Sequence, residues 1–327
     1  KITTTGNNAH GVYARGLGMI SLGNVDISTT GNTANGLYAS STTANKLAEI
    51  YLSGDADITV GTGSAIYATG VSAVIKSHDV SSSSDVSGVY NINGNILSAN
   101  KALVSLNMAN GSQFEGITDA KLGTSTAGTL NLFIDGDNSV WEMTGNSNLT
   151  TLNLDNGSTL RYGAVADINT TDFVLGAGGG VIDTNGFDNT LDELISGSGS
   201  LSKTGEGTLI LTGINEYTGG TKVEKGTLQL DATTTTSQVN LSSGAANIAL
   251  EATLAALADG EFTFNNVLTG EGILSASNQG EAFHFSSDVG SDFKGTVALA
   301  NNTFALTGDN TAALTQATLQ LDAGNIT

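Results

Sequence analysis

Apolar and polar residues alternate along most of the chain, in short runs that end at glycine. The clearest runs lie within residues 195–230, and the side chains there that we expect to point inward are Leu201, Leu209, Leu211, Val223, Leu228 and Leu230. A spacing of two is that of a β-strand with one buried face, and glycine allows the tight turns between such strands. The pattern therefore predicts many short strands separated by turns.

The strands recur as copies of a longer unit. Residues 2–14 (ITTTGNNAHGVYA) are nearly restated at residues 27–39 (ISTTGNTANGLYA), and a looser third copy begins at Ile58 and ends in Ile66-Tyr67-Ala68. Repeats of this length are typical of stacked architectures, in which insertions fall in loops. We therefore expect a β-solenoid, in which equivalent residues of successive coils lie above one another.

The spacing and composition of the alternating runs change twice along the chain. We therefore expect one continuous solenoid over residues 1–327 with three sections, at 1–128, 129–231 and 232–327. The second contains Trp141, the only tryptophan, which we expect in the core. The third closes with an alternating unit at 302–310. Residues 249–258 (ALEATLAALA) have high helix propensity, but the flanking pattern favours strand and turn, with one short helical excursion as the alternative.

Composition agrees with a slim solenoid. Hydrophobic residues make up 39% of the chain but aromatic residues only 6%, so we expect a narrow core of small aliphatic side chains. The chain has 43 glycines and no proline, and proline lacks the N–H that every stacked strand must donate to its neighbour. The absence of cysteine fits export, because no disulfide can form before the chain crosses a membrane.

Residues 195–230 also resemble the passenger-associated repeat of bacterial autotransporters, the proteins of type V secretion. The matching positions are Gly197, Gly199, Leu201, Lys203, Gly205, Gly207, Thr208, Leu209, Leu211, Gly213, Asn215, Tyr217, Gly219, Thr221, Val223, Gly226 and Leu228. The segment around Trp141 is similar to a pertactin-like passenger core. The resemblance implies a passenger folded as a right-handed parallel β-helix, a single elongated rod. Such a passenger is exported through the periplasm to the outer membrane and stays at the cell surface or is secreted after cleavage. We expect this chain to be a fragment without signal peptide or membrane barrel.

Catalytic and metal-binding patterns are not evident. Without cysteine, thiol nucleophiles and thiolate metal sites are excluded, and the three histidines, His10, His78 and His284, have no metal-binding spacing. The acidic run at 135–138 lacks the continuation of a calcium loop. We therefore expect no enzyme activity, catalytic residue, metal or cofactor, although a triad of dispersed residues stays open.

The net negative charge of the chain argues against anionic partners. With 11 basic and 31 acidic residues the formal net charge is −20, which repels nucleic acid and anionic membrane surfaces. Lys203, Lys222 and Lys225 form a local exception. The acidic surface either keeps a sheet-rich protein soluble or serves as a binding surface for cationic partners.

Two acidic positions stand out within the repeats. Asp26 and Asp57 each precede a repeated isoleucine that we expect to face inward, so the two carboxylates face outward on successive coils. Such like charges destabilise the stack unless a cation or a partner group lies between them. Asn7 and Asn32 occupy equivalent loop positions and could form an amide ladder. We take these four residues as a candidate self-association or ligand face, with stabilisation of the stack itself as the alternative.

The function that these observations favour is that of a cell-surface adhesin. Its partners would be copies of itself on neighbouring cells, in aggregation and biofilm formation, or host-surface or matrix molecules, through many weak polar contacts. The alternative is a secreted virulence effector or a carbohydrate-active enzyme carried on the β-helix. Against the latter, the sequence shows no row of aromatic residues on which sugars could stack.

Overall fold

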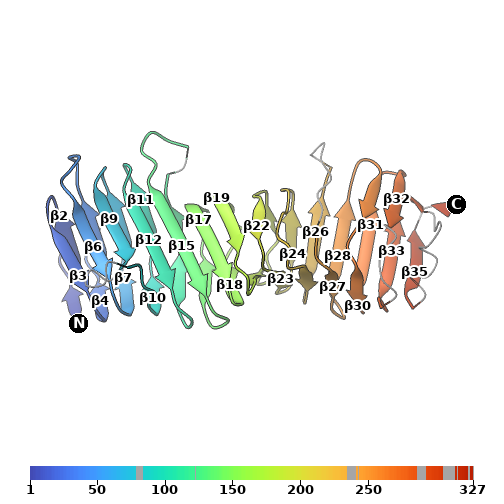
Figure 1. The fold of residues 1–327 in the computed structure, drawn as a ribbon, viewed down its shortest axis with the longest axis horizontal. Coiled ribbons are helices and arrows are strands. Elements are labelled where there is room, and N and C mark those ends of the chain that lie inside the picture. The colour runs from blue at the N-terminus through green and yellow to red at the C-terminus, as the bar shows by residue number, and fades with distance from the viewer. Residues whose placement is uncertain are drawn as a thin grey trace. The chain divides into compact units, whose positions relative to one another are not determined.

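The computed structural model describes residues 1–78, 84–121, 123–233, 241, 243–285, 292–304, 314, 316–322 and 325–326. Two compact units make up the chain, Lys1–Phe173 and Val174–Thr327. Within each unit short strands stack coil upon coil, and the ladders that join successive coils are parallel (Figure 1). Each unit is thus a parallel β-solenoid, the fold class expected from the alternation and the repeats. The prediction of one continuous rod over residues 1–327 stays a prediction.

The first unit has three strands in most coils. Its strands are β1 (Ile2–Thr4), β2 (Val12–Arg15), β3 (Met19–Leu22), β4 (Val25–Thr29), β5 (Leu37–Ser40), β6 (Ala48–Leu52), β7 (Ala56–Val60), β8 (Ile66–Thr69), β9 (Ala73–Ser77), β10 (Tyr90–Asn93), β11 (Ile96–Ala99), β12 (Leu103–Met108), β13 (Gln113–Gly116), β14 (Thr118–Asp119), β15 (Thr129–Asp135), β16 (Val140–Met143), β17 (Ser147–Asp155) and β18 (Ser158–Tyr162). One sheet runs β1-β4-β7-β10-β13-β16-β18, and another follows β2-β5-β8-β11-β14-β17. The remaining strands stack as β3-β6-β9-β12-β15-β17, so that the long β17 joins the last two stacks. Strand β19 (Ile168–Leu175) includes the boundary between the units.

The second unit also consists of short strands that stack in parallel from coil to coil. Its strands are β20 (Gly180–Asp183), β21 (Asn189–Leu191), β22 (Ile195–Gly197), β23 (Leu201–Thr204), β24 (Thr208–Leu211), β25 (Thr221–Val223), β26 (Thr227–Asp231), β27 (Ala246–Ile248), β28 (Thr253–Leu257), β29 (Phe262–Phe264), β30 (Leu268–Gly270), β31 (Ile273–Ser277), β32 (Ala282–Phe285), β33 (Thr296–Ala300), β34 (Thr303–Phe304), β35 (Thr318–Asp322) and β36 (Asn325–Ile326). They stack as β20-β23-β25-β27-β30, as β21-β24-β26-β28-β31-β33-β35 and as β29-β32-β34-β36.

Inward-facing side chains form ladders because each one lies above its equivalent on the next coil. In the first unit Ile27, Ile58 and Ile92 follow one another in register and are buried, and the same row continues as Phe114 and Trp141. The last two rings stack with their centroids 5.4 Å apart, and the indole N–H of Trp141 donates a hydrogen bond of 3.0 Å to the carbonyl of Gly116. Trp141 is therefore a core residue, as expected.

Residues 249–258, the stretch with high helix propensity, form a strand and turns. Residues 253–257 form strand β28, which pairs in parallel with β26 and β31, and no residue from 249 to 258 is helical. Stacking between two coils provides more backbone pairing and burial than one isolated helical turn, so tertiary context outweighs local propensity. Most of the predicted closing unit at 302–310 lies outside the described residues.

The passenger-like segment forms coils whose inward positions agree with the prediction, since Leu201, Leu209, Leu211, Val223, Leu228 and Leu230 are all buried. Lys203 differs from the expectation of a basic surface exception, because its side chain is fully buried. It lies on the inward phase of β23, two residues after Leu201, and its Nζ donates hydrogen bonds to the carbonyls of Thr204 (2.9 Å), Gly205 (2.8 Å) and Lys225 (3.0 Å). Lys203 thus links two successive coils.

A glycine of the repeat leaves room for this contact. Gly226 has a φ of +66°, a backbone conformation that other residues rarely adopt. A Cβ at this position would lie 2.5 Å from the carbonyl oxygen of Gly207 and 3.1 Å from Nζ of Lys203. The lysine and the glycine of the motif therefore belong to one packing arrangement.

Candidate binding face

The outward side of the sheet β4-β7-β10-β13-β16-β18 carries two rows of polar side chains, which we call the polar face. The alternation that buries the isoleucine ladder turns every second residue of these strands toward solvent. The first row consists of Asp26, Asp57, Asn91 and Gln113. The second row consists of Ser28, Thr59, Asn93, Glu115, Glu142 and Arg161.

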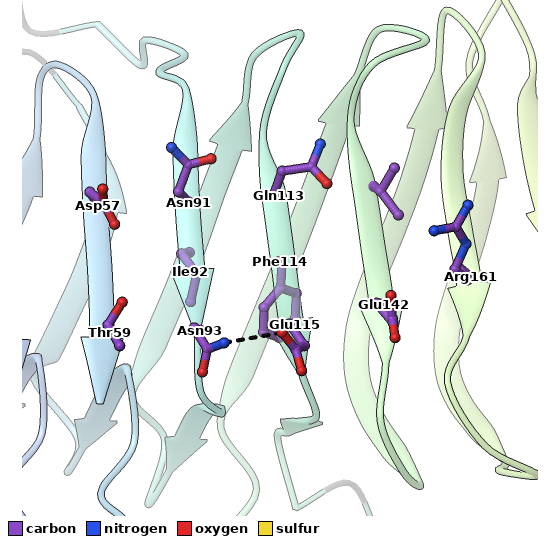
Figure 2. Close-up of a pocket in the computed structure, with 11 residues that line it drawn as sticks. Asp57, Thr59, Asn91, Ile92, Asn93, Gln113, Phe114, Glu115, Glu142 and Arg161 are labelled. Carbon is purple, nitrogen blue, oxygen red and sulfur yellow. Dashed lines mark hydrogen bonds between the residues drawn. The ribbon is translucent and has the colours of Figure 1, made fainter. Parts of the chain in front are cut away.

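The middle of the polar face is hollowed. A shallow pocket of about 240 Å³ lies between strands β7 and β18, and its lining includes members of both rows (Figure 2). Asp57, Asn91 and Gln113 lie on one side of it and Thr59, Asn93 and Glu115 on the other, so that amides occupy its centre. Its three carboxylates and single guanidinium give it a negative balance.

The two glutamates of the hollow lie on neighbouring strands. Glu115 of β13 and Glu142 of β16 are in register, an arrangement of like charges that destabilises a sheet unless other groups offset it. Both have a complementary neighbour on their outer side. The amide of Asn93 donates a 3.0 Å hydrogen bond to Glu115, drawn as a dashed line in Figure 2, and Arg161 is in register with Glu142 on β18.

The structure places the four predicted site residues in two places of the first unit. Asp26 and Asp57 are in register on β4 and β7, and Nζ of Lys1 lies 3.1 Å from the carboxylate of Asp26, where it offsets part of the repulsion. Asn7 and Asn32 lie at the turn that follows β1 and β4 and do not belong to the polar face. The side-chain oxygen of Asn7 accepts a 3.0 Å hydrogen bond from the backbone N–H of Asn32. Their role as a ligand face stays a prediction.

Most of the polar face was not found from the sequence. Asn91, Gln113, Glu115, Glu142 and Arg161 come from coils whose lengths differ, so their equivalence is hidden until the strands are paired. The signal that could have located them is the residue beside each inward apolar position. That signal needs the coil boundaries, which insertions of variable length obscure.

A row of aromatic residues corrects the expectation that none exists. Tyr13, Tyr38 and Tyr67 lie in register on β2, β5 and β8, with ring centroids 4.8 Å and 5.4 Å apart, and Tyr13 is 43% exposed. The ring of His10 lies 4.6 Å from that of Tyr38. A chain poor in aromatics gathers these three because each follows the same position of the repeated unit, a signal present in all three copies.

A polar cluster of Lys76, His78 and Asp85 fixes the segment before β10 to the end of β9. The carboxylate of Asp85 lies 3.1 Å from Nζ of Lys76 and 2.9 Å from Nδ1 of His78. Hydrogen bonds from Lys76 and then from His78 hold the pKa of Asp85 below its ordinary value. Beside this cluster Gly88 pairs with the end of β12, through a 3.1 Å hydrogen bond from its N–H to the carbonyl of Asn107.

The described residues have no group of side chains suited to a metal ion and no helix suited to a membrane span. No cluster of three or more histidine, aspartate or glutamate side chains there could hold a metal. No helix in that part of the chain is long and apolar enough to cross a membrane.

Residues 201–230 match the model of the passenger-associated-transport-repeat family. These residues form the coils from β23 to β26, within a parallel β-solenoid. The repeat and the solenoid together fit an autotransporter passenger domain. The buried Lys203 and the turn at Gly226 lie within the passenger repeat.

Two curated proteins of Escherichia coli (strain K12) are similar to this chain. The protein named uncharacterized lipoprotein YdeK is 32% identical over 239 residues, which cover 63% of this chain and 17% of YdeK. The protein named uncharacterized protein YuaQ is 39% identical over 67 residues, which cover 20% of this chain and 5% of YuaQ. The matched segments thus cover less than a fifth of the length of either relative. No solved structure matches the chain.

Proposed function

We propose that this passenger is a cell-surface adhesin that holds bacteria together by pairing of its polar face with the polar face of a copy on a neighbouring cell. The observation that supports the proposal is the composition of that face. Its centre, at Asn91, Asn93 and Gln113, consists of amides, which both donate and accept hydrogen bonds and are therefore complementary to themselves. A two-fold pairing uses the same surface on both copies.

Charge decides the direction of this pairing. Carboxylates dominate both ends of the polar face, with Asp26 and Asp57 at one end and Glu115 and Glu142 beside Arg161 at the other. A parallel pairing would place like carboxylates opposite each other. An antiparallel pairing brings the amide centres together and Arg161 toward the aspartates of the other copy, so the antiparallel arrangement costs less.

Weak contacts suffice at a cell surface. Each amide pair contributes little, but many copies held on two facing membranes act together and raise the effective concentration. The location fits this role, since a passenger repeat indicates a surface or secreted protein and the relative YdeK is named as a lipoprotein, in keeping with the cell envelope. Host-surface or matrix molecules are the alternative partners. The absence of enzyme activity stays a prediction. Glu115 and Glu142, the neighbouring carboxylates of the hollow, are the residues to substitute if hydrolysis of a saccharide is ever observed.

The test adds charge to the amide centre. Asn91→Glu with Gln113→Glu places two further carboxylates where the two copies meet, and we expect cells that display this variant to stop aggregating. Ser275→Glu with Ala298→Glu, on the outward positions of β31 and β33, is the matched control and should leave aggregation unchanged. Equal aggregation by both variants and the parent would exclude this face.

Purified protein provides a second measurement. In analytical ultracentrifugation we expect weak dimers that strengthen as salt is added, because salt screens the repulsion between two chains of net charge −20. The amide-centre variant should sediment as a monomer under the same conditions. A parent chain that is monomeric at every concentration and salt level would direct attention to a host ligand instead.

A further inference from the structure

A second hollow of the first unit lies beside Tyr38 and Tyr67, and most of its lining belongs to the turns that precede β2, β5, β8 and β11. It has a volume of about 390 Å³, and its lining includes the rings of Tyr38, Tyr67 and His10 together with Asn and Thr side chains of three successive coils. None of its lining residues is an aspartate, glutamate, lysine or arginine. On a chain with a net charge of −20, a hollow without charged side chains is a distinct chemical environment.

Hydrogen bonds hold the polar groups of this hollow in place. The backbone N–H of Asn35 donates a 3.0 Å bond to Nδ1 of His10, so Nδ1 is an acceptor and the remaining N–H of the ring is on Nε2. Burial lowers the pKa of His10, which keeps the ring neutral at neutral pH. The side-chain oxygen of Asn35 accepts a 2.8 Å bond from the backbone of Ser64, which leaves its amide N–H groups as donors. Fixed donors of this kind select a ligand by its hydrogen-bond acceptors.

The tyrosines contribute ring edges and hydroxyl groups. Because Tyr38 lies between the rings of Tyr13 and Tyr67, both its faces are covered and it presents its edge and its hydroxyl outward. The three hydroxyls form no hydrogen bond with any other described residue. They therefore repeat along the stack at the spacing of the coils, which is about 4.8 Å in a parallel sheet.

From this geometry we infer that the tyrosine row and its neutral hollow bind an uncharged saccharide chain that lies along the stack of coils. Carbohydrate sites combine aromatic surface with fixed amide and hydroxyl groups, and this hollow has both without a charge that would select an ionic ligand. The coil spacing is close to the length of one sugar unit in an extended polysaccharide. Successive sugars would thus meet equivalent tyrosines on successive coils.

The site is separate from the proposed pairing of polar faces. The tyrosines are on β2, β5 and β8, whereas the polar face is on β4, β7, β10, β13, β16 and β18. A variant can therefore lose saccharide binding while it keeps cell aggregation, and the reverse also holds.

The experiment titrates the purified chain with labelled cellohexaose, maltohexaose and an oligomer of N-acetylglucosamine, with polygalacturonate as an anionic comparison, and follows binding by fluorescence anisotropy. We expect one of the neutral oligosaccharides to bind and polygalacturonate not to bind. Tyr38→Thr removes the central ring and should weaken binding about tenfold, as truncation of an aromatic anchor does. Tyr38→Phe keeps the stack and should lose less, because only one hydroxyl is removed.

Phe133→Ser is the matched control, since Phe133 is an outward aromatic residue of β15, 37% exposed, away from the tyrosine row. It should bind as the parent does, and circular dichroism should show the same fold for all variants. The inference is overturned if none of the three neutral oligosaccharides binds, or if Tyr38→Thr folds and binds as tightly as the parent. Preferential binding of polygalacturonate would also overturn it, because this hollow has no cationic side chain to pair with the carboxylates of that polymer.

Discussion

Lys203→Met removes a fully buried ammonium group and keeps a side chain of similar length. In the parent chain the ammonium donates to three carbonyls, of which that of Lys225 belongs to the next coil. Each buried carbonyl left without a donor costs about 1–3 kcal/mol, and part of this is offset because no charge is buried any longer. We expect the variant to lower the free energy of local unfolding of these coils by about 3 kcal/mol. This is the lower limit of the cost of removing one partner from a buried charged interaction.

Hydrogen exchange followed by mass spectrometry measures this loss locally. In peptides from residues 201–230, a loss of about 3 kcal/mol corresponds to exchange about 100-fold faster. Lys222→Met is the control, because the Lys222 side chain is 53% exposed and its ion pair with Glu224, 2.8 Å long, contributes about 0–1 kcal/mol. If Lys203→Met exchanged no faster than Lys222→Met, the lysine would not link the coils.

The parent chain has a pH dependence of known sign that this variant lacks. Burial lowers the pKa of Lys203 from 10.5 to about 8, so the folded chain releases this proton at lower pH than the unfolded chain does. Between pH 8 and 10.5 unfolding therefore takes up a proton, and the free energy of unfolding rises by up to about 1 kcal/mol per pH unit relative to Lys203→Met. Urea unfolding followed by circular dichroism at pH 7 to 10 measures the difference. A difference between the two proteins that stays constant over this range would contradict a buried, titrating amine.

Three further changes probe other parts of the fold. Trp141→Ala should lower the free energy of unfolding of the first unit by about 3–5 kcal/mol in urea, because it empties part of the stacked core; a loss below about 1 kcal/mol would contradict this. Tyr217→Phe should cost about 1 kcal/mol in the same assay, since the buried hydroxyl loses its 2.6 Å hydrogen bond with Thr221, and an unchanged midpoint would argue against that bond. Asp85 has a lowered pKa, so its ion pairs stabilise the segment around Gly88 above the ordinary carboxyl range and are lost as the pH falls through the lowered value. Amide exchange at Gly88 should then accelerate in acid in the parent relative to Asp85→Asn, and parallel profiles would refute the contact.

Local pattern was a reliable guide wherever a residue's phase within its own strand decides its environment. The inward position of Leu201, Leu209 and Val223 follows from their spacing, as does the outward position of Asp26 and Asp57 in front of two repeated isoleucines. These inferences need no knowledge of distant parts of the chain, because alternation is a property of the extended backbone.

The same rule could have placed Lys203, which lies two residues after Leu201 and so shares its inward phase. A basic residue is normally assumed to be exposed, because a charge is costly to bury without partners. Its partners are backbone carbonyls, one of them from the following coil, and the sequence does not show that these converge on Nζ.

The amino-acid pattern is enough to predict a β-solenoid, because alternation, glycine turns, the absence of proline and the repeated unit are all local or nearly local properties. Which outward polar residues become neighbours depends on how the coils pair in the folded chain. The two rows of the polar face depend on register between coils of unequal length, and that register is set by backbone pairing and core fit once the chain has folded. Insertions change the separation of two residues along the chain without changing their place on the coil, and so they conceal neighbours that the folded chain brings within one strand spacing.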